Sequence, residues 1–119
     1  MKTVLLIDDS TAVRERLAEM LSAVPDVRII GQAGDGNEGV ARFRQVDPDL
    51  VILDIQMPGL NGIDVLRIIK KDKPETTAIV LTNFPYPQYR DICFKAGADF
   101  FFDKSSEFEK VMDILQPEP

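Results

Sequence analysis

Short apolar runs alternate along the chain with longer amphipathic segments. The runs are rich in Val, Ile, Leu and Phe, and they lie at Val4–Ile7, Val27–Ala33, Leu50–Leu53, Ala78–Leu81 and Phe100–Phe102. They have the length and composition of strands, and four of them are apolar on both faces. This pattern is typical of a parallel sheet that is covered by helices on both sides.

Amphipathic helices are predicted between these strands. The first has apolar residues along one helical face, namely Val13, Leu17, Met20, Leu21 and Val24. The fourth has the same kind of face at Tyr89, Ile92, Cys93 and Ala96, and Gly97 is expected to cap its end. Segments 36–46 and 62–71 are expected to form the second and third helices.

The fifth helix is predicted to begin at Ser106, because Ser106 and Glu109 have the spacing of a capping box. Its buried face would consist of Phe108, Val111, Met112 and Leu115. Five strand–helix units then make one doubly wound α/β domain over residues 1–119, with residues 116–119 expected as a disordered tail or the start of a linker. Such folds bind ligands at the carboxyl ends of their strands.

Composition and charge exclude several classes of protein. Hydrophobic residues make up 45% and charged residues 29%, as in ordinary globular domains. The net charge of −6 does not support direct nucleic-acid binding. The apolar runs fall far short of the roughly 20 residues of a membrane span, and no signal-peptide pattern follows Met1, so we expect a cytoplasmic protein with no membrane partner. Because histidine is absent, any phosphohistidine in the working cycle must belong to another molecule.

Three aspartates follow predicted strands. Asp8 and Asp9 come directly after the first strand, and Asp54 comes directly after the third. An Asp pair at this position alone is commonly a helix cap. Three carboxylates at one sheet edge, however, repel one another by about 4 kcal/mol per pair at about 4 Å, so the cluster must bind a proton or a cation. Oxygen ligands of this kind suit Mg²⁺.

A hydroxyl and a cation are predicted at the same edge, because Thr82 ends the fourth strand and Lys104 ends the fifth. Alone, a threonine there is usually a turn residue and a lysine is usually solvated. Together with Asp54 they predict a phosphoryl site, in which the carboxylate is the nucleophile and Mg²⁺, Lys104 and Thr82 stabilise the phosphate oxygens.

A glycine-rich segment, Gly34-Asp35-Gly36-Asn37-Glu38-Gly39, has the letters of a dinucleotide-binding fingerprint. Asp35 and Glu38 would place negative charge beside a pyrophosphate. We therefore expect these glycines to be turn residues.

Four motifs make the chain resemble the receiver domain of bacterial two-component response regulators: Ile7-Asp8-Asp9-Ser10, Leu53-Asp54-Ile55-Gln56-Met57-Pro58-Gly59, Leu81-Thr82 and Lys104. The resemblance covers essentially the whole chain. It implies a flavodoxin-like (βα)5 three-layer sandwich with strand order 2-1-3-4-5. Gly59 and Gly62 are expected to supply backbone angles that other residues resist.

The resemblance also implies a role for each site residue. Asp54 is the expected phosphoacceptor and a Mg²⁺ ligand; Asp9 binds the metal directly, Asp8 through water, and Gln56 through its backbone carbonyl. Thr82, Lys104 and Phe101 are the expected phosphate-binding and switch residues, with Phe101 turning inward on phosphorylation. Asn83 stands where the family controls access to the phosphoryl group, so the lifetime of the acyl phosphate is open.

The implied partners are proteins. A histidine kinase or histidine phosphotransfer protein would donate the phosphoryl group. The surface of the fourth helix, fifth strand and fifth helix would then signal to a protein target or a fused output domain, or form a homodimer. The Phe84-Pro85-Tyr86-Pro87 loop before the fourth helix predicts either exposed aromatic surface or packing of both rings.

One enzymatic alternative shares this chemistry. Haloacid-dehalogenase-type phosphohydrolases also use an Asp nucleophile, Mg²⁺, a Thr or Ser and a Lys. Their nucleophile lies in a D-x-D motif on the first strand, whereas Asp8 and Asp9 are adjacent here. The sequence therefore favours a phosphorylation switch that is not an enzyme acting on metabolites.

Overall fold

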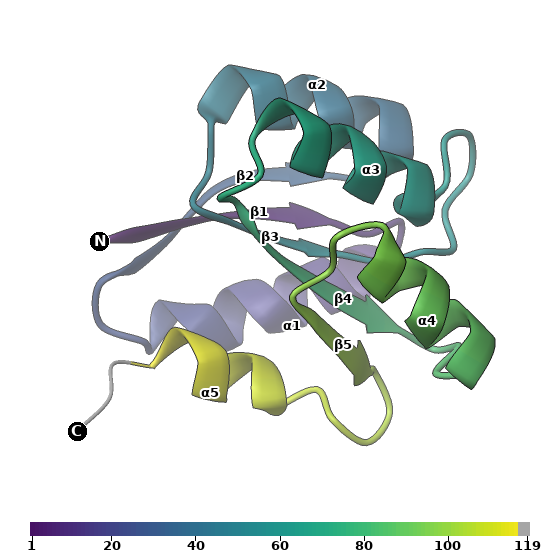
Figure 1. Ribbon diagram of the computed structural model, residues 1–119. Helices are drawn as coiled ribbons and strands as arrows, with labels where there is room; N and C mark the ends of the chain where they lie inside the picture. Colours follow the sequence, from purple (N-terminus) through teal and green to yellow (C-terminus); the bar gives the residue numbers. More distant parts are fainter. Residues whose placement is uncertain (117–119) are drawn as a thin grey trace.

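Five parallel strands form one sheet in the order β2-β1-β3-β4-β5 (Figure 1). The computed structural model describes residues 1–116. The strands are β1 (Lys2–Ile7), β2 (Val27–Ala33), β3 (Leu50–Leu53), β4 (Thr77–Thr82) and β5 (Phe100–Asp103). The predicted fold class and strand order are confirmed.

Helices cover both faces of the sheet (Figure 1). On one face lie α1 (Thr11–Ser22) and α5 (Lys110–Leu115), and on the other lie α2 (Gly36–Val46), α3 (Gly62–Asp72) and α4 (Pro87–Lys95). Within residues 1–116, none of the helices combines the length and apolar character needed to cross a membrane.

Side chains along β1 point alternately to the two faces of the sheet, and this explains why the protein has two cores. Leu5 and Ile7 pack toward α2 and α3, whereas Val4 and Leu6 pack toward α1 and α5. All four side chains are fully buried. A strand that is apolar on both faces therefore forms the middle layer of a three-layer sandwich, as its sequence predicted.

The predicted start of the fifth helix is wrong, because α5 begins at Lys110. The Ser106 hydroxyl donates instead to Asp103 Oδ2 at 2.9 Å, and Asp103 Oδ1 accepts bonds from the amide and hydroxyl of Ser105. These local bonds keep the residues after β5 in a turn and leave the capping box unformed. The predicted apolar face holds for three of its four residues, since Phe108, Val111 and Leu115 are buried and Met112 is partly buried.

Candidate functional site

Parallel pairing brings the three aspartates together. Ile7 at the end of β1 pairs with Leu53 at the end of β3, and the Asp54 amide donates to the Ile7 carbonyl at 3.0 Å. Carboxylate oxygens of Asp8, Asp9 and Asp54 all lie within 4.8 Å of one another. Asp8 and Asp54 are buried, whereas Asp9 is exposed at the mouth of the site.

Lys104 joins the two buried carboxylates. Its Nζ lies 2.8 Å from Asp8 Oδ2 and 2.8 Å from Asp54 Oδ2. All three side chains are at most 7% exposed. The cluster therefore contains two buried carboxylates bridged by one buried ammonium, a pairing that offsets part of the cost of burying charge.

Burial and pairing act in opposite directions on the ionisation of this cluster. Burial raises the pKa of Asp8, and the bonds from Lys104 and the Ser10 amide offset only part of that rise. Burial also works against the charge of Lys104, but the hydrogen bonds and charges of Asp54 and Asp8 outweigh it and raise the pKa of the amine. Lys104 is therefore held in its charged form.

Backbone amides orient the remaining carboxylate oxygens. The Ser10 amide donates to Asp8 Oδ1 at 2.9 Å, and the Gln56 amide donates to Asp54 Oδ1 at 3.2 Å. The Ser10 hydroxyl in turn accepts from the Val13 amide and caps α1. Helix capping, which was the simpler interpretation of the Asp pair, thus belongs to Ser10.

Thr82 is fully buried at the end of β4, and its hydroxyl contacts a residue of the following loop. Its hydroxyl oxygen accepts from the Phe84 amide at 3.0 Å. The following loop is open to solvent, with Asn83 exposed and Phe84 and Tyr86 exposed by 38% and 51%. Of the two expectations for this loop, exposed aromatic surface is therefore the one that holds.

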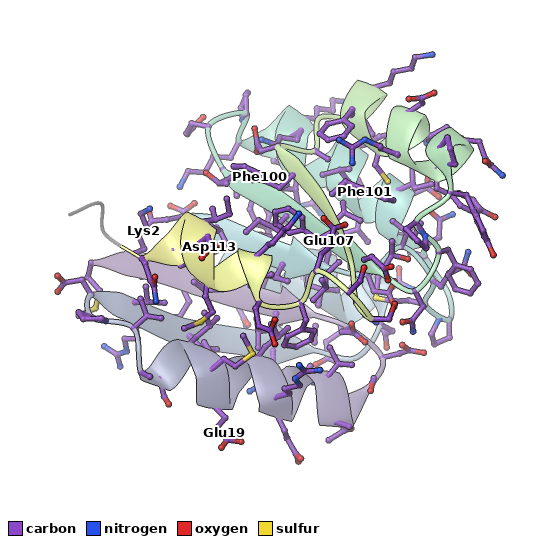
Figure 2. All side chains as sticks on the ribbon, turned by 90° about the horizontal axis from the view of Figure 1, so that it is seen from below. Lys2, Glu19, Phe100, Phe101, Glu107 and Asp113 are labelled. Atoms are coloured by element: carbon purple, nitrogen blue, oxygen red, sulfur yellow. The ribbon has the colours of Figure 1, made fainter. Side chains whose placement is uncertain are left out.

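Phe101 lies inside the protein in this structure. The ring is 4% exposed and belongs to the core beneath α4, whereas Phe100 faces the opposite core on the same strand (Figure 2). The Arg90 guanidinium of α4 lies 5.9 Å from the Phe101 ring centroid. The predicted inward position is thus already present, which differs from the expectation that phosphorylation would bring it about.

Two glycines of the fingerprint-like segment have packing roles and are not turn residues. A Cβ on Gly36 would lie 1.8 Å from the Leu60 carbonyl oxygen, and a Cβ on Gly39 would lie 2.8 Å from Ile7. Gly62 has a similar role, because a Cβ there would lie 2.0 Å from the Asp54 carbonyl oxygen. Of Gly59 and Gly62, it is Gly59, with φ of 74°, that has the expected left-handed backbone.

One residue of the site was missed in the sequence. Arg14 of α1 donates to the Asp8 carbonyl and to the side chain of Gln32. Its position beside the apolar stripe of α1, between Val13 and Leu17, was the available signal: an arginine there is half-buried and needs a polar partner.

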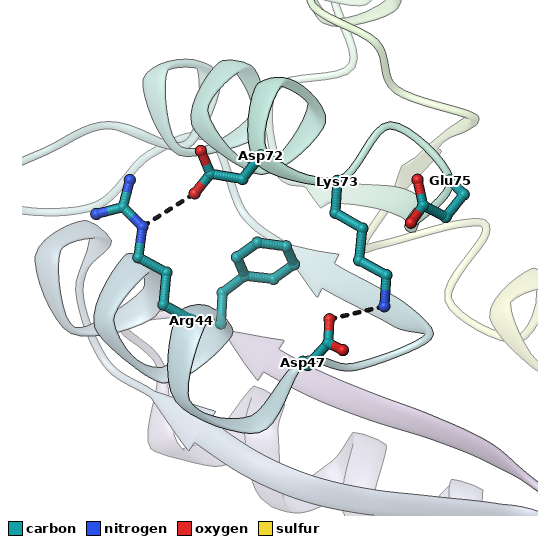
Figure 3. A pocket seen from close by; sticks show the side chains of 6 residues that line it. Arg44, Asp47, Asp72, Lys73 and Glu75 are labelled. Carbon is teal, nitrogen blue, oxygen red and sulfur yellow. Dashed lines mark hydrogen bonds and ion pairs between the residues drawn. The ribbon is translucent and has the colours of Figure 1, made fainter.

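A separate hollow of about 510 Å³ lies at the opposite edge of the sheet, near the starts of β3 and β4. Phe43 forms its wall, and the ion pairs Arg44–Asp72 and Lys73–Asp47 flank it at 2.9 Å and 2.7 Å (Figure 3). Both cations are already paired with carboxylates. This hollow therefore contributes nothing to the Asp54 site.

The family model described as "Response regulator receiver domain" matches residues 4–116. Transcriptional regulatory protein LiaR of Bacillus subtilis is 36% identical over 113 residues, which cover 95% of this chain and 54% of LiaR. Protein-glutamate methylesterase/protein-glutamine glutaminase 1 of Myxococcus xanthus is 40% identical over 120 residues, which cover 98% of this chain and 34% of that protein.

A solved receiver-domain structure has the same fold as this chain. The response regulator domain of Thermotoga maritima CheB superposes with a TM-score of 0.85 at 28% identity, covering 100% of this chain and 99% of that domain. The chain spans about half the length of LiaR, the first of these relatives. None of these matches supports the phosphohydrolase alternative. The chain belongs to the response regulator receiver domain family.

Proposed function

We propose that Asp54 accepts a phosphoryl group from a phosphohistidine on a partner kinase or phosphotransfer protein, and that this modification switches the surface of α4, β5 and α5. The observation that carries the proposal is the Lys104 bridge, because Lys104 holds Asp54 beside a second carboxylate at the carboxyl edge of the sheet. A cation already in place can balance the charge of an incoming phosphate.

The donor atoms of this site fit Mg²⁺. Asp8, Asp9 and Asp54 offer carboxylate oxygens within 4.8 Å of one another. Each buried carboxylate accepts two hydrogen bonds here and retains lone pairs for a further ligand. Asp9, Asp54 and the Gln56 carbonyl would hold the ion directly, and Asp8 through water. When bound, Mg²⁺ would neutralise phosphate oxygens and reduce repulsion between the carboxylates.

The transfer step needs only groups that the two proteins supply. A carboxylate oxygen of Asp54 attacks phosphorus, a P–O bond forms, and the P–N bond to the partner's imidazole breaks. The imidazole leaves with the bonding electron pair and takes a proton from solvent. Lys104 moves its hydrogen bond from Asp54 to a phosphate oxygen, so the ammonium remains paired throughout.

The switch that we propose begins at Thr82. Its hydroxyl oxygen now holds the Phe84 amide at 3.0 Å. If Thr82 turns toward a phosphoryl group on Asp54, that bond is lost and the Asn83–Tyr86 loop is released. Because Phe84 and Tyr86 are exposed on this loop, its movement changes the surface that a partner meets. Phe101 would hold the inward position that favours the signalling state, and Asn83 would modulate access to the phosphoryl group.

The downstream role follows from the same surface. We propose that it contacts a protein target or a fused output domain, or forms a homodimer, and that the domain does not act as an enzyme on metabolites. Names such as transcriptional regulatory protein and methylesterase show that relatives of this receiver serve different outputs. We place the switch in the cytoplasm, where a kinase partner could reach it.

Stoichiometry tests this proposal. The protein is incubated with acetyl phosphate and Mg²⁺, and the phosphoryl groups per chain are measured by intact-protein mass spectrometry. We expect at most one per chain, and none without Mg²⁺. Sustained hydrolysis of a general substrate such as p-nitrophenyl phosphate, far beyond one equivalent of protein, would instead identify a phosphohydrolase.

A further inference from the structure

Arg14 reaches from α1 across the turn that carries Asp8 and Asp9. Its Nη1 donates to the backbone carbonyl of Asp8 at 2.5 Å, and its Nε donates to Gln32 Oε1 on β2 at 3.2 Å. Its Nη2 lies 3.4 Å from the Thr11 hydroxyl. One guanidinium therefore links α1, β2 and the turn between β1 and α1.

The carbonyl that Arg14 holds belongs to the peptide between the two aspartates. The orientation of this peptide determines the directions in which the side chains of Asp8 and Asp9 leave the backbone. The turn is fixed from two further sides, since the Asp8 amide donates to the Ala33 carbonyl and the Ser10 amide donates to Asp8 Oδ1. Arg14 supplies the contact on the carbonyl side.

Charge balance does not account for this arrangement. Within residues 1–116, no ion pair joins Arg14 to a carboxylate, whereas Lys104 pairs with both Asp8 and Asp54. The N–H groups of the Arg14 guanidinium contact neutral oxygens of Asp8, Gln32 and Thr11. A cation this close to the aspartates would by charge alone repel Mg²⁺, so a benefit to metal binding must come from geometry.

We propose that Arg14 is a positioning residue for the metal site, which holds the Asp8–Asp9 peptide so that both carboxylates face the ion. This role rests on the proposed function, because it concerns the same Mg²⁺. Charge and geometry make opposite predictions here. Loss of the positive charge alone would strengthen Mg²⁺ binding, whereas loss of the guanidinium hydrogen bonds would weaken it.

The test compares Arg14→Lys, which keeps the positive charge and loses the planar guanidinium donors, with Arg14→Gln, which loses both. Mg²⁺ affinity is measured by titrating the ¹⁵N-labelled full chain and following the amide shifts of Asp9 and Gln56. The control is Arg42→Gln, since Arg42 is exposed on α2 and its side chain donates to Gln45. We expect both Arg14 variants to bind Mg²⁺ about 10-fold more weakly than the wild type, with the control unchanged.

A second readout separates an effect on metal binding from a direct role of Arg14 in phosphoryl transfer. The rate of labelling by acetyl phosphate should return to the wild-type maximum when Mg²⁺ is raised to saturation. Unchanged Mg²⁺ affinity in Arg14→Lys, or tighter binding in Arg14→Gln, would overturn the positioning role. If Arg14→Gln does not fold, Arg14→Lys decides the matter. Failure of the wild type itself to bind Mg²⁺ would overturn the proposed function, and this role with it.

Discussion

Lys104 Nζ lies 2.8 Å from Asp54 Oδ2, although 50 residues separate them in the chain. In the sheet, β4 stands between β3, which Asp54 follows, and β5, which Lys104 follows. A cation at the end of β5 must therefore reach across a whole strand, and the long side chain of lysine allows this. The same nitrogen also contacts Asp8, so one residue pairs with both buried carboxylates of the site.

Replacing Lys104 should destabilise the fold in the absence of metal. Lys104→Met leaves two buried carboxylates without their shared cation, and we expect it to lower the free energy of unfolding by about 3 kcal/mol. Mg²⁺ should recover part of this loss, because it binds the folded state. Urea unfolding with and without Mg²⁺ measures both effects.

Lys110→Met is the matched control, because the Lys110–Glu107 pair is exposed. It should cost less than about 1 kcal/mol. Equal losses in the two variants would contradict the role assigned to the Lys104 bridge.

The raised pKa of Asp8 predicts a pH-dependent effect of Asp8→Asn. Because burial raises this pKa in the folded protein, the proton on Asp8 favours folding at low pH. That contribution is lost as the pH rises from the ordinary value of 3.8 through the folded-state pKa, and the ionised carboxylate then costs stability.

We therefore expect Asp8→Asn to raise the free energy of unfolding at neutral pH in Mg²⁺-free buffer. The gain over wild type should shrink as the pH falls through that window. Urea unfolding over a series of pH values tests this. A gain that increases toward low pH would show that the sign of the Asp8 effect is wrong.

Two glycines of the fingerprint-like segment should respond differently to alanine. At Gly36 the new Cβ would meet the Leu60 carbonyl oxygen at 1.8 Å, so the loop after Asp54 must shift. We expect Gly36→Ala to cost about 3 kcal/mol. At Gly34 the nearest atom is Arg14 Nη1 at 3.5 Å, an ordinary contact, and Gly34→Ala should cost little. Thermal melts compare them, and similar melting temperatures would refute the packing role of Gly36.

Cys93 should be unreactive in the folded protein. The side chain is fully buried, and burial raises the pKa of its thiol to about 11. Because the thiolate is the reactive form, labelling with a disulfide reagent such as DTNB should be slow in native buffer and complete in urea. Rapid labelling of the native protein at neutral pH would mean that α4 opens readily or packs differently.

The fold and the meeting of the main site residues could be predicted because both follow from strand periodicity. A residue that ends or directly follows a parallel strand must lie at the carboxyl edge, so Asp8, Asp54, Thr82 and Lys104 had predictable places. The contacts among them depend on side-chain reach and local bonds. For that reason the sequence did not reveal that Lys104 bridges two carboxylates, or that Thr82 binds the loop amide of Phe84.

The errors arose where local motifs compete with packing. Ser106 matched a capping box, but its hydroxyl donates to Asp103 instead, and the residues after β5 form a turn. Gly36 resembled a turn residue, yet its role is close contact with Leu60, which is distant in sequence. Arg14 belongs to none of the motifs in the sequence. Such roles depend on pairs of residues that only the folded chain brings together.

The most direct test of the account is to locate the phosphoryl group. Borohydride reduces an acyl phosphate to an alcohol, so a labelled aspartate becomes homoserine and can be found by peptide mass spectrometry. Asp113, exposed on α5, supplies the control variant Asp113→Asn (Figure 2). After treatment with acetyl phosphate and Mg²⁺, we predict homoserine at position 54 in the wild type and in Asp113→Asn, and none in Asp54→Asn. Homoserine at another aspartate, or a phosphate that resists reduction, would contradict the central claim.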